Sequence, residues 1–297
     1  MLSHSINELV DILKDYEKTN VNYNDVLIWL KQFELFGISE EEKKIILDDL
    51  IKVFKITYFS KSRVIKFLKN IINKNLEDIK NNNCSFLDVQ SFRETYNKSE
   101  SQKEYVNLLQ KIAKEDFKLD ISLNDFHKEK LIYIDDYLLT GGSFSADLNF
   151  ITKKTNIDKV KIYFLIILYE QWNEELKKRK QILFEKLDQI SYEIVLTGYF
   201  TYFSFNSNQK KFFEYNNITK EYFKKANEYI VSKIEKNKNY WNRRVKSMFI
   251  SAVYRNIPNN TPICLWWGDK EKSNIWFPLL ERKSMNYLKQ NKEEMSF

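Results

Sequence analysis

The chain has 297 residues, 43% of them hydrophobic and 15% aromatic, and carries a formal net charge of +7. This apolar content excludes a disordered protein, and no apolar run reaches the ~20 residues of a membrane-spanning helix. The two cysteines and two histidines form no ligand pattern for zinc. The first residues lack the basic-then-apolar layout of a secretion signal, so we expect a cytoplasmic protein with no membrane association.

Residues 1–80 are predicted to be helical throughout and to form a small all-helical N-terminal region. Apolar residues recur there at helical spacing, as in the stripes at 9–13 and 26–36. Ser39, followed by three glutamates, is typical of a helix N-cap with an acidic first turn. The asparagines at 81–83 are expected to link this region to the rest of the chain. Nothing in the region indicates chemistry.

Positive charge gathers in two segments of the chain. Residues 51–80 carry eight basic and two acidic side chains, and residues 220–246 carry nine and three. Such blocks are typical of surfaces that contact phosphate-rich partners, and equally of solvated lysine-rich helix faces. Both interpretations stay open.

Residues 85–285 alternate between strand-like and helix-like segments, which predicts an α/β domain, and residues 286–297 are expected to form a tail. Short crossovers between the segments favour a parallel sheet. The expected strands lie at 131–135, 159–169, 190–196 and 263–267. The expected helices lie at 103–113, 143–152 and 170–187, with Thr219 as the cap of another.

The stretch from Asp135 to Ser143, Asp-Asp-Tyr-Leu-Leu-Thr-Gly-Gly-Ser, carries the strongest functional signal. The chain has only five glycines, and two of them are adjacent here. A glycine pair between a strand and a helix indicates a backbone geometry that side chains would prevent. Two carboxylates at a strand end can accept hydrogen bonds from ribose hydroxyls, and a following helix N-terminus can receive a phosphate. The stretch therefore suits a phosphorylated sugar.

This stretch resembles the phosphoribosyl pyrophosphate (PRPP) loop of type I phosphoribosyltransferases. The resemblance implies a type I phosphoribosyltransferase-like parallel sheet with flanking helices, preceded here by the all-helical region. Residues 260–267 and 276–282 resemble the C-terminal end of phosphoribosyltransferase-like proteins of bacterial conflict (anti-phage defence) systems. That second resemblance implies an effector that modifies or consumes a nucleotide.

The resemblance also implies roles for single residues. Asp135 and Asp136 would be the catalytic residues and contact the 2′- and 3′-hydroxyls of the ribose. Mg²⁺ would enter with PRPP, with these two carboxylates as possible further ligands. A tight strand-to-helix turn capped by Ser143 is the structural alternative. The residues expected to bind the substrate phosphate are Thr140, Gly141, Gly142 and Ser143, with Leu139 at a variable position of the loop.

A second loop of the family, nearer the N-terminal end of the sheet, contacts pyrophosphate through backbone amides and a basic residue. Residues 98–102 lie where that loop is expected, and Lys98 would be the basic residue. The segment lacks glycine, and Glu100 would add negative charge beside pyrophosphate. An ordinary helix cap is the alternative, and this departure from the family pattern leaves transfer activity open.

The acceptor base is usually bound after the next strand and by a variable hood. Aromatic side chains at those places could stack on a base, although buried core aromatics are the commoner case. The stacking candidates are Tyr169, Trp172, Trp266 and Trp267.

Three functions follow from these observations. The first is a phosphoribosyltransferase-like enzyme that binds PRPP or a related nucleotide with Mg²⁺ as a defence effector. The second is a catalytically inactive module that senses PRPP or a nucleotide. The third is binding of nucleic acid, or of a partner protein of a defence system, through the helical N-terminal region.

Overall fold

The computed structural model describes most of the N-terminal two thirds of the chain and parts of the remainder. The described residues are 2–92, 101–137, 142–154, 160–166, 193–196, 215–234, 250, 252–255, 257, 261–268, 270 and 275–282. Contacts divide the chain into two compact units. The first unit comprises Met1–Lys61 and Lys210–Phe297, and the second comprises Ser62–Gln209. In sequence, the second unit is therefore an insertion within the first.

The second unit contains a four-stranded sheet in which all neighbouring strands are parallel. Its strands, in spatial order, are β2 (Cys84–Leu87), β3 (Lys130–Tyr137), β4 (Val160–Ile166) and β5 (Glu193–Leu196). Within the described residues, β3, β4 and β5 match the strands expected at 131–135, 159–169 and 190–196. The short strand β2 was not expected, because four residues give too little alternation to recognise. The unit is of the α/β class.

The direction in which successive strands are added to the sheet changes between β2 and β3. On the side away from β3, the amide of Phe86 in β2 donates to the carbonyl of Ser122, and the amide of Asn124 donates to the carbonyl of Phe86, both at 2.9 Å. This pairing forms a parallel bridge between Phe86 and Leu123. The chain therefore leaves β2 toward one edge of the sheet, and it continues from β3 toward the other edge. Such a reversal is a topological switch point.

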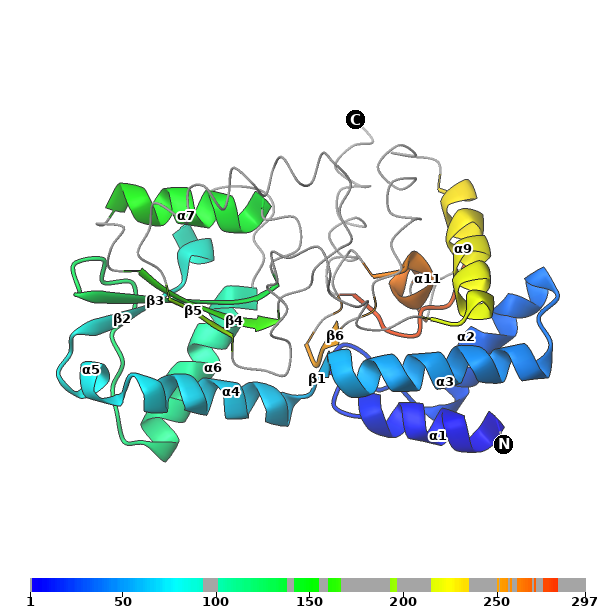
Figure 1. Ribbon diagram of the computed structural model, residues 1–297, viewed down its shortest axis with the longest axis horizontal. Coiled ribbons are helices and arrows are strands. Elements are labelled where there is room, and N and C mark those ends of the chain that lie inside the picture. The colour runs from blue at the N-terminus through cyan, green and yellow to red at the C-terminus, as the bar shows by residue number, and fades with distance from the viewer. Residues whose placement is uncertain are drawn as a thin grey trace, which may run out of the picture. The chain divides into compact units, whose positions relative to one another are not determined.

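Two helices that follow these strands cover opposite faces of the sheet (Figure 1). Helix α6 (Ser101–Asp116) connects β2 to the Leu123 bridge, and α7 (Gly142–Lys154) connects β3 to β4. Two right-handed crossovers that lead toward opposite edges of a sheet place their helices on opposite faces of it. The positions of α6 and α7 therefore follow from the change of direction between β2 and β3. The helices expected at 103–113 and 143–152 are both present.

The described part of the second unit also contains two further helices and a short 3₁₀ segment. They are α4 (Lys61–Lys74), α5 (Leu76–Lys80) and η2 (Val89–Phe92). Residues 81–83, expected as a linker, form the turn between α5 and β2, where Asn82 takes a positive φ of 55°. The sequence-based domain division, 1–80, 85–285 and 286–297, stays a prediction beside these contact-based units.

The first unit is mainly helical. Its elements in the described residues are α1 (Leu2–Leu13), α2 (Tyr23–Lys31), the 3₁₀ helix η1 (Gln32–Phe36), α3 (Glu40–Thr57), α9 (Asn217–Ser232) and α11 (Ile263–Trp266), with the parallel strand pair β1 (Tyr58–Phe59) and β6 (Ala252–Val253). Helix α1 packs along α3 (Figure 1). No helix in the described part of the chain is long and apolar enough to cross a membrane.

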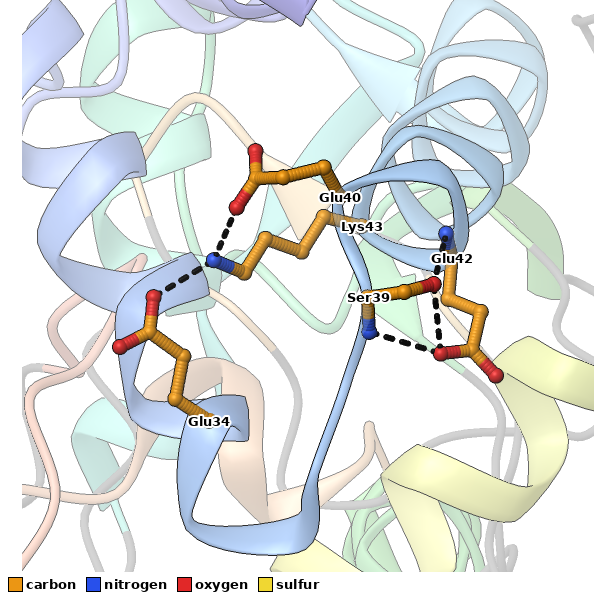
Figure 2. Close-up of polar contacts among 5 residues, drawn as sticks. All are labelled: Glu34, Ser39, Glu40, Glu42 and Lys43. Atoms are coloured by element: carbon orange, nitrogen blue, oxygen red, sulfur yellow. Dashed lines mark hydrogen bonds and ion pairs between the residues drawn. The ribbon is translucent and has the colours of Figure 1, made fainter.

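The N-terminus of α3 is closed by the cap expected from the sequence (Figure 2). The hydroxyl of Ser39 accepts from the Glu42 amide at 3.3 Å, and the Glu42 carboxylate accepts from the Ser39 amide at 2.8 Å. This reciprocal pair is a capping box. From the same turn, the ammonium group of Lys43 lies 2.6 Å from both Glu34 and Glu40, which compensates its charge where its side chain is only 6% exposed.

Residues 263–266, which are buried in the core of the first unit, have a different local structure from the expected one. The strand expected at 263–267 is wrong, because residues 263–266 form the short helix α11 and Trp267 follows it as the C-cap. A buried apolar run of this length does not distinguish a strand from a helix. Thr219 is also not a cap: Asn216 caps α9, and the buried Thr219 hydroxyl donates to Asp49 at 2.7 Å.

Candidate functional site

The carboxyl ends of the four parallel strands meet at one edge of the sheet, and the loops of interest follow them. The segment 93–100, with Lys98, follows β2 and η2, and the segment 138–141 follows β3. Ligands of open α/β sheets bind at this edge, at the switch point. Because the switch point lies between β2 and β3, the topology brings together the strands that lead into both expected loops. Lys98, Leu139, Thr140 and Gly141 themselves lie outside the described residues.

Asp135, near the carboxyl end of β3, is held by the protein on both carboxylate oxygens. Its Oδ2 accepts from the hydroxyl of Tyr133 at 2.9 Å, and its Oδ1 accepts from the Asp136 amide at 2.9 Å. The side chain is 4% exposed. Burial, together with the negative charge of Asp136, raises the pKa of Asp135 well above its ordinary value. This carboxyl group therefore holds its proton more tightly than an exposed aspartate does.

The contact of Asp135 with Tyr133 extends to helix α7. The Tyr133 hydroxyl also lies 2.8 Å from Oδ2 of Asp147, a fully buried residue of α7. Burial, reinforced by the charges of Asp135 and Asp147, raises the pKa of Tyr133, so the phenol stays protonated. Asp147, Tyr133 and Asp135 thus form a continuous polar relay from α7 to the end of β3.

Asp136 is connected to the opposite face of the sheet, where α6 lies. The hydroxyl of Tyr105 in α6 is 3.3 Å from Oδ2 of Asp136, whose side chain is 7% exposed. The side-chain amide of Gln102, one turn earlier in α6, donates to the Ile134 carbonyl at 3.1 Å. The two adjacent acids are therefore supported by different helices.

Helix α7 begins at Gly142, two residues after Thr140, so Gly142 and Ser143 lie in its first turn. A helix of 13 residues presents unpaired backbone amides and a partial positive charge at this end. This is the environment that a phosphate group prefers.

Of the four aromatic stacking candidates, Trp266 and Trp267 lie in the described part of the chain, and their ring centres are 6.1 Å apart. Trp266 is 1% exposed, donates to the Thr261 carbonyl at 2.9 Å, and has the Arg282 guanidinium 5.1 Å from its ring centre. Trp267 is partly exposed. Both belong to the first unit, where Trp266 packs in the core. Tyr169 and Trp172 lie outside the described residues.

Sequence reasoning missed Tyr133, Asp147 and Tyr105 as neighbours of the two acids. A signal existed for Tyr133, because residues two apart on a strand share a face. A signal also existed for Asp147, an acid next to the apolar positions of an expected helix. Tyr105 has no comparable signal, since its contact depends on how α6 packs on β3.

The described residues offer no group of three or more His, Cys, Asp or Glu side chains placed to hold a metal ion. Asp135 and Asp136 lie near the carboxyl end of β3, and carboxylate oxygens are ligands of the kind that Mg²⁺ takes from a protein.

Fold and site together define an α/β protein with a candidate ligand site at the carboxyl edge of a parallel sheet. The family model PRTase-CE matches residues 26–282, most of the chain. The chain belongs to this family, which is phosphoribosyltransferase-like. No curated protein and no solved structure gives a significant match.

Proposed function

We propose that this protein binds PRPP, or a related ribose phosphate, with Mg²⁺ at the carboxyl edge of β2 and β3, and that it is a phosphoribosyltransferase-like enzyme. The observation that carries the proposal is the switch point between β2 and β3, with Asp135 and Asp136 at the end of β3 and the start of α7 five residues beyond Tyr137. Family membership supports the same ligand class.

The proposed binding mode divides the ligand among three elements. Asp135 and Asp136 accept hydrogen bonds from the ribose hydroxyls, and the amides at the start of α7 receive the 5′-phosphate. Lys98, in the segment after β2, contacts the pyrophosphate. Mg²⁺, when bound with PRPP, supplies positive charge that stabilises the departing pyrophosphate.

The proposed transfer is a substitution at ribose C1. A nucleophile donates its electron pair to C1, the bond from C1 to the pyrophosphate oxygen breaks, and pyrophosphate leaves with that electron pair. Carboxylates near the ribose stabilise the positive charge that develops on the ring. Segment 98–102 contains Glu100 and no glycine, so the alternative is a module that binds PRPP without transfer.

Titration calorimetry with PRPP and MgCl₂ tests the binding proposal, and pyrophosphate release on the same samples tests transfer. We expect wild type to bind and the Asp135→Asn/Asp136→Asn double variant to lose binding while it stays folded. The control is Asp120→Asn, an exposed acid elsewhere in the same unit. Equal affinity of the double variant and wild type would refute the site. Binding without pyrophosphate release would identify the sensing module.

A role in anti-phage defence is part of the proposal and rests on the resemblance of the C-terminal segments. Expression of the gene in bacteria challenged with phage tests it, with the double variant as the matched control. Equal protection by wild type and double variant would separate defence from the ligand site.

A second candidate function, nucleic-acid binding, is favoured by the composition of α4. This helix has five basic residues and no acidic residue. Lys69 is paired with Asp116 at 2.9 Å, whereas Lys66 and Lys74 are exposed. Binding of a labelled DNA duplex that weakens steeply with salt, and is lost in Lys66→Glu/Lys74→Glu, would support it. No binding at low salt would exclude it.

A further inference from the structure

The polar relay from α7 to β3 joins the two halves of the proposed ligand site. Asp135 belongs to the part that would contact the ribose, and the start of α7 belongs to the part that would contact the phosphate. The Tyr133 hydroxyl contacts Asp135 at 2.9 Å and Asp147 at 2.8 Å. Asp147 lies five residues after Gly142, a little more than one helical turn from the start of α7.

The relay is buried along its whole length. Tyr133 and Asp147 are both 0% exposed, and Asp135 is 4% exposed. Leu148 and Ile151, at 2% and 0% exposed, anchor the same helix in the core. A polar chain that is enclosed in a packed core adopts few alternative rotamers. The distance from the Asp135 carboxylate to the first turn of α7 is therefore set by the relay together with the packing of α7.

Buried aspartates are uncommon in apolar helix faces, because burial of a carboxylate without a hydrogen-bond partner is costly. Packing alone does not require a carboxylate at this position. Asp147 thus has a reason to be present that packing does not provide, and the Tyr133 contact supplies one.

We propose that Tyr133 and Asp147 are positioning residues that hold Asp135 in register with the N-terminus of α7, so that one ligand engages a ribose hydroxyl and a phosphate at the same time. This inference rests on the proposed function, because it assigns a purpose within that ligand site. It predicts that the relay matters for ligands that carry both groups and matters little for phosphate alone.

The test compares ribose 5-phosphate with inorganic phosphate by titration calorimetry on the full chain. In Tyr133→Phe we expect affinity for ribose 5-phosphate to fall about tenfold, the effect of losing one oriented hydrogen bond. The affinity for inorganic phosphate should change by less than about twofold, since α7 itself is intact. Asp147→Asn keeps a polar group that can donate to, or accept from, the tyrosine hydroxyl, and it should retain most of the affinity that Asp147→Ala loses.

Leu148→Ala is the matched control, because it weakens the packing of the same helix without removing a member of the relay. It should lower the melting temperature while the ratio of the two affinities stays at the wild-type value. A double-mutant cycle shows whether Tyr133 acts through Asp135. In an Asp135→Asn background, Tyr133→Phe should have no further effect on ribose 5-phosphate.

An unchanged affinity ratio in Tyr133→Phe and Asp147→Ala would overturn the inference. The inference would also be overturned if Tyr133→Phe lowered the affinity for ribose 5-phosphate in the Asp135→Asn background as much as it does in wild type. If wild type binds neither PRPP nor ribose 5-phosphate, the proposed function fails and this inference fails with it. Wild-type binding with an unchanged ratio in the variants refutes the positioning role alone.

Discussion

The indole N–H of Trp29 donates to the backbone carbonyl of Cys264 at 2.8 Å, although 235 positions separate the two residues. Trp276 donates to the same carbonyl, also at 2.8 Å, and the Cys264 amide donates to Asn227 at 2.9 Å. Helices α2 and α9 and the segment that carries Trp276 therefore converge on one residue of α11, Cys264. The aromatic rings around this point, such as Phe33 and Trp276 with centres 5.3 Å apart, belong to the same core.

The two indole donors predict coupling between Trp29 and Trp276. Trp29→Phe leaves the Cys264 carbonyl with one indole donor, so we expect a loss of roughly 1–3 kcal/mol, mostly from packing. The double variant with Trp276→Phe removes both donors. Its loss of unfolding free energy should exceed the sum of the losses in the two single variants by about 1 kcal/mol. Urea unfolding of the four proteins of the cycle measures this. If the losses in the two single variants add strictly, the shared carbonyl contributes nothing to the coupling between the two tryptophans.

The same core predicts that residues 1–80 do not fold alone. In the intact chain the buried side chains of α2 and η1 contact residues after 216, as in the stacking of Phe33 on Phe223 at 6.2 Å. Without those partners, the isolated fragment exposes a large apolar surface. We expect it to show weak helicity by circular dichroism and no cooperative urea transition. A cooperative transition would favour the sequence-based domain boundary near residue 80.

A pH dependence is predicted for Asp135. Its folded-state pKa is raised by burial and by the charge of Asp136, so the folded protein holds this proton more tightly than the unfolded chain. This stabilising contribution is complete below the unfolded pKa, about 3.9, and is lost as pH rises through the folded pKa. Asp135→Asn lacks this loss. Its melting temperature should therefore gain on wild type as pH rises from the unfolded pKa through the raised folded pKa.

Melting curves at several pH values test this prediction, and Asp120→Asn is again the exposed control. The difference from wild type should change with pH for Asp135→Asn and stay constant for the control. If the melting temperatures of wild type and Asp135→Asn change with pH in parallel, Asp135 is not the titrating group.

The capping box of α3 predicts a second, opposite pH dependence. Hydrogen bonds from the Ser39 amide and hydroxyl lower the pKa of Glu42. The contribution of Glu42 is therefore present above its unfolded pKa, about 4.3, and is lost as pH falls through the lower folded pKa. Ser39→Ala should cost about 1 kcal/mol at pH 7. Wild type should lose stability in urea unfolding as pH falls through the folded pKa of Glu42. Glu42→Gln should lack this acid-induced loss of stability, and Glu41→Gln, in the same turn, should show it as wild type does.

Local signals in the sequence predicted much of the fold. The apolar run before Asp135 marked β3, and Ser39 with its glutamates marked the start of α3, because both features depend on neighbouring residues. The segment 263–266 was mistaken for a strand because its helical form depends on donors from Trp29 and Trp276, far away in the sequence. Thr219 was mistaken for a cap because its hydroxyl pairs with Asp49 in another helix.

The candidate site was predictable to a similar extent. Asp135 and Asp136 were identified from one contiguous motif, and β3 places them near the carboxyl end of a parallel strand. The relay through Tyr133 to Asp147 was not identified, because it requires α7 to lie over β3 with Asp147 turned toward the sheet. The reversal at the Leu123 bridge was equally hidden, since a single-residue bridge leaves no pattern in the sequence.

The insertion of residues 62–209 within the first unit has a consequence for biosynthesis. At ~5–20 residues per second, a ribosome needs roughly 10–50 s to pass from Trp29 to Cys264. The N-terminal helices thus emerge first but receive their core partners last, while the contiguous second unit can fold during the delay. For that interval the apolar side chains of α2 and η1 that pack on residues after 216 stay exposed on the nascent chain, where chaperones would bind.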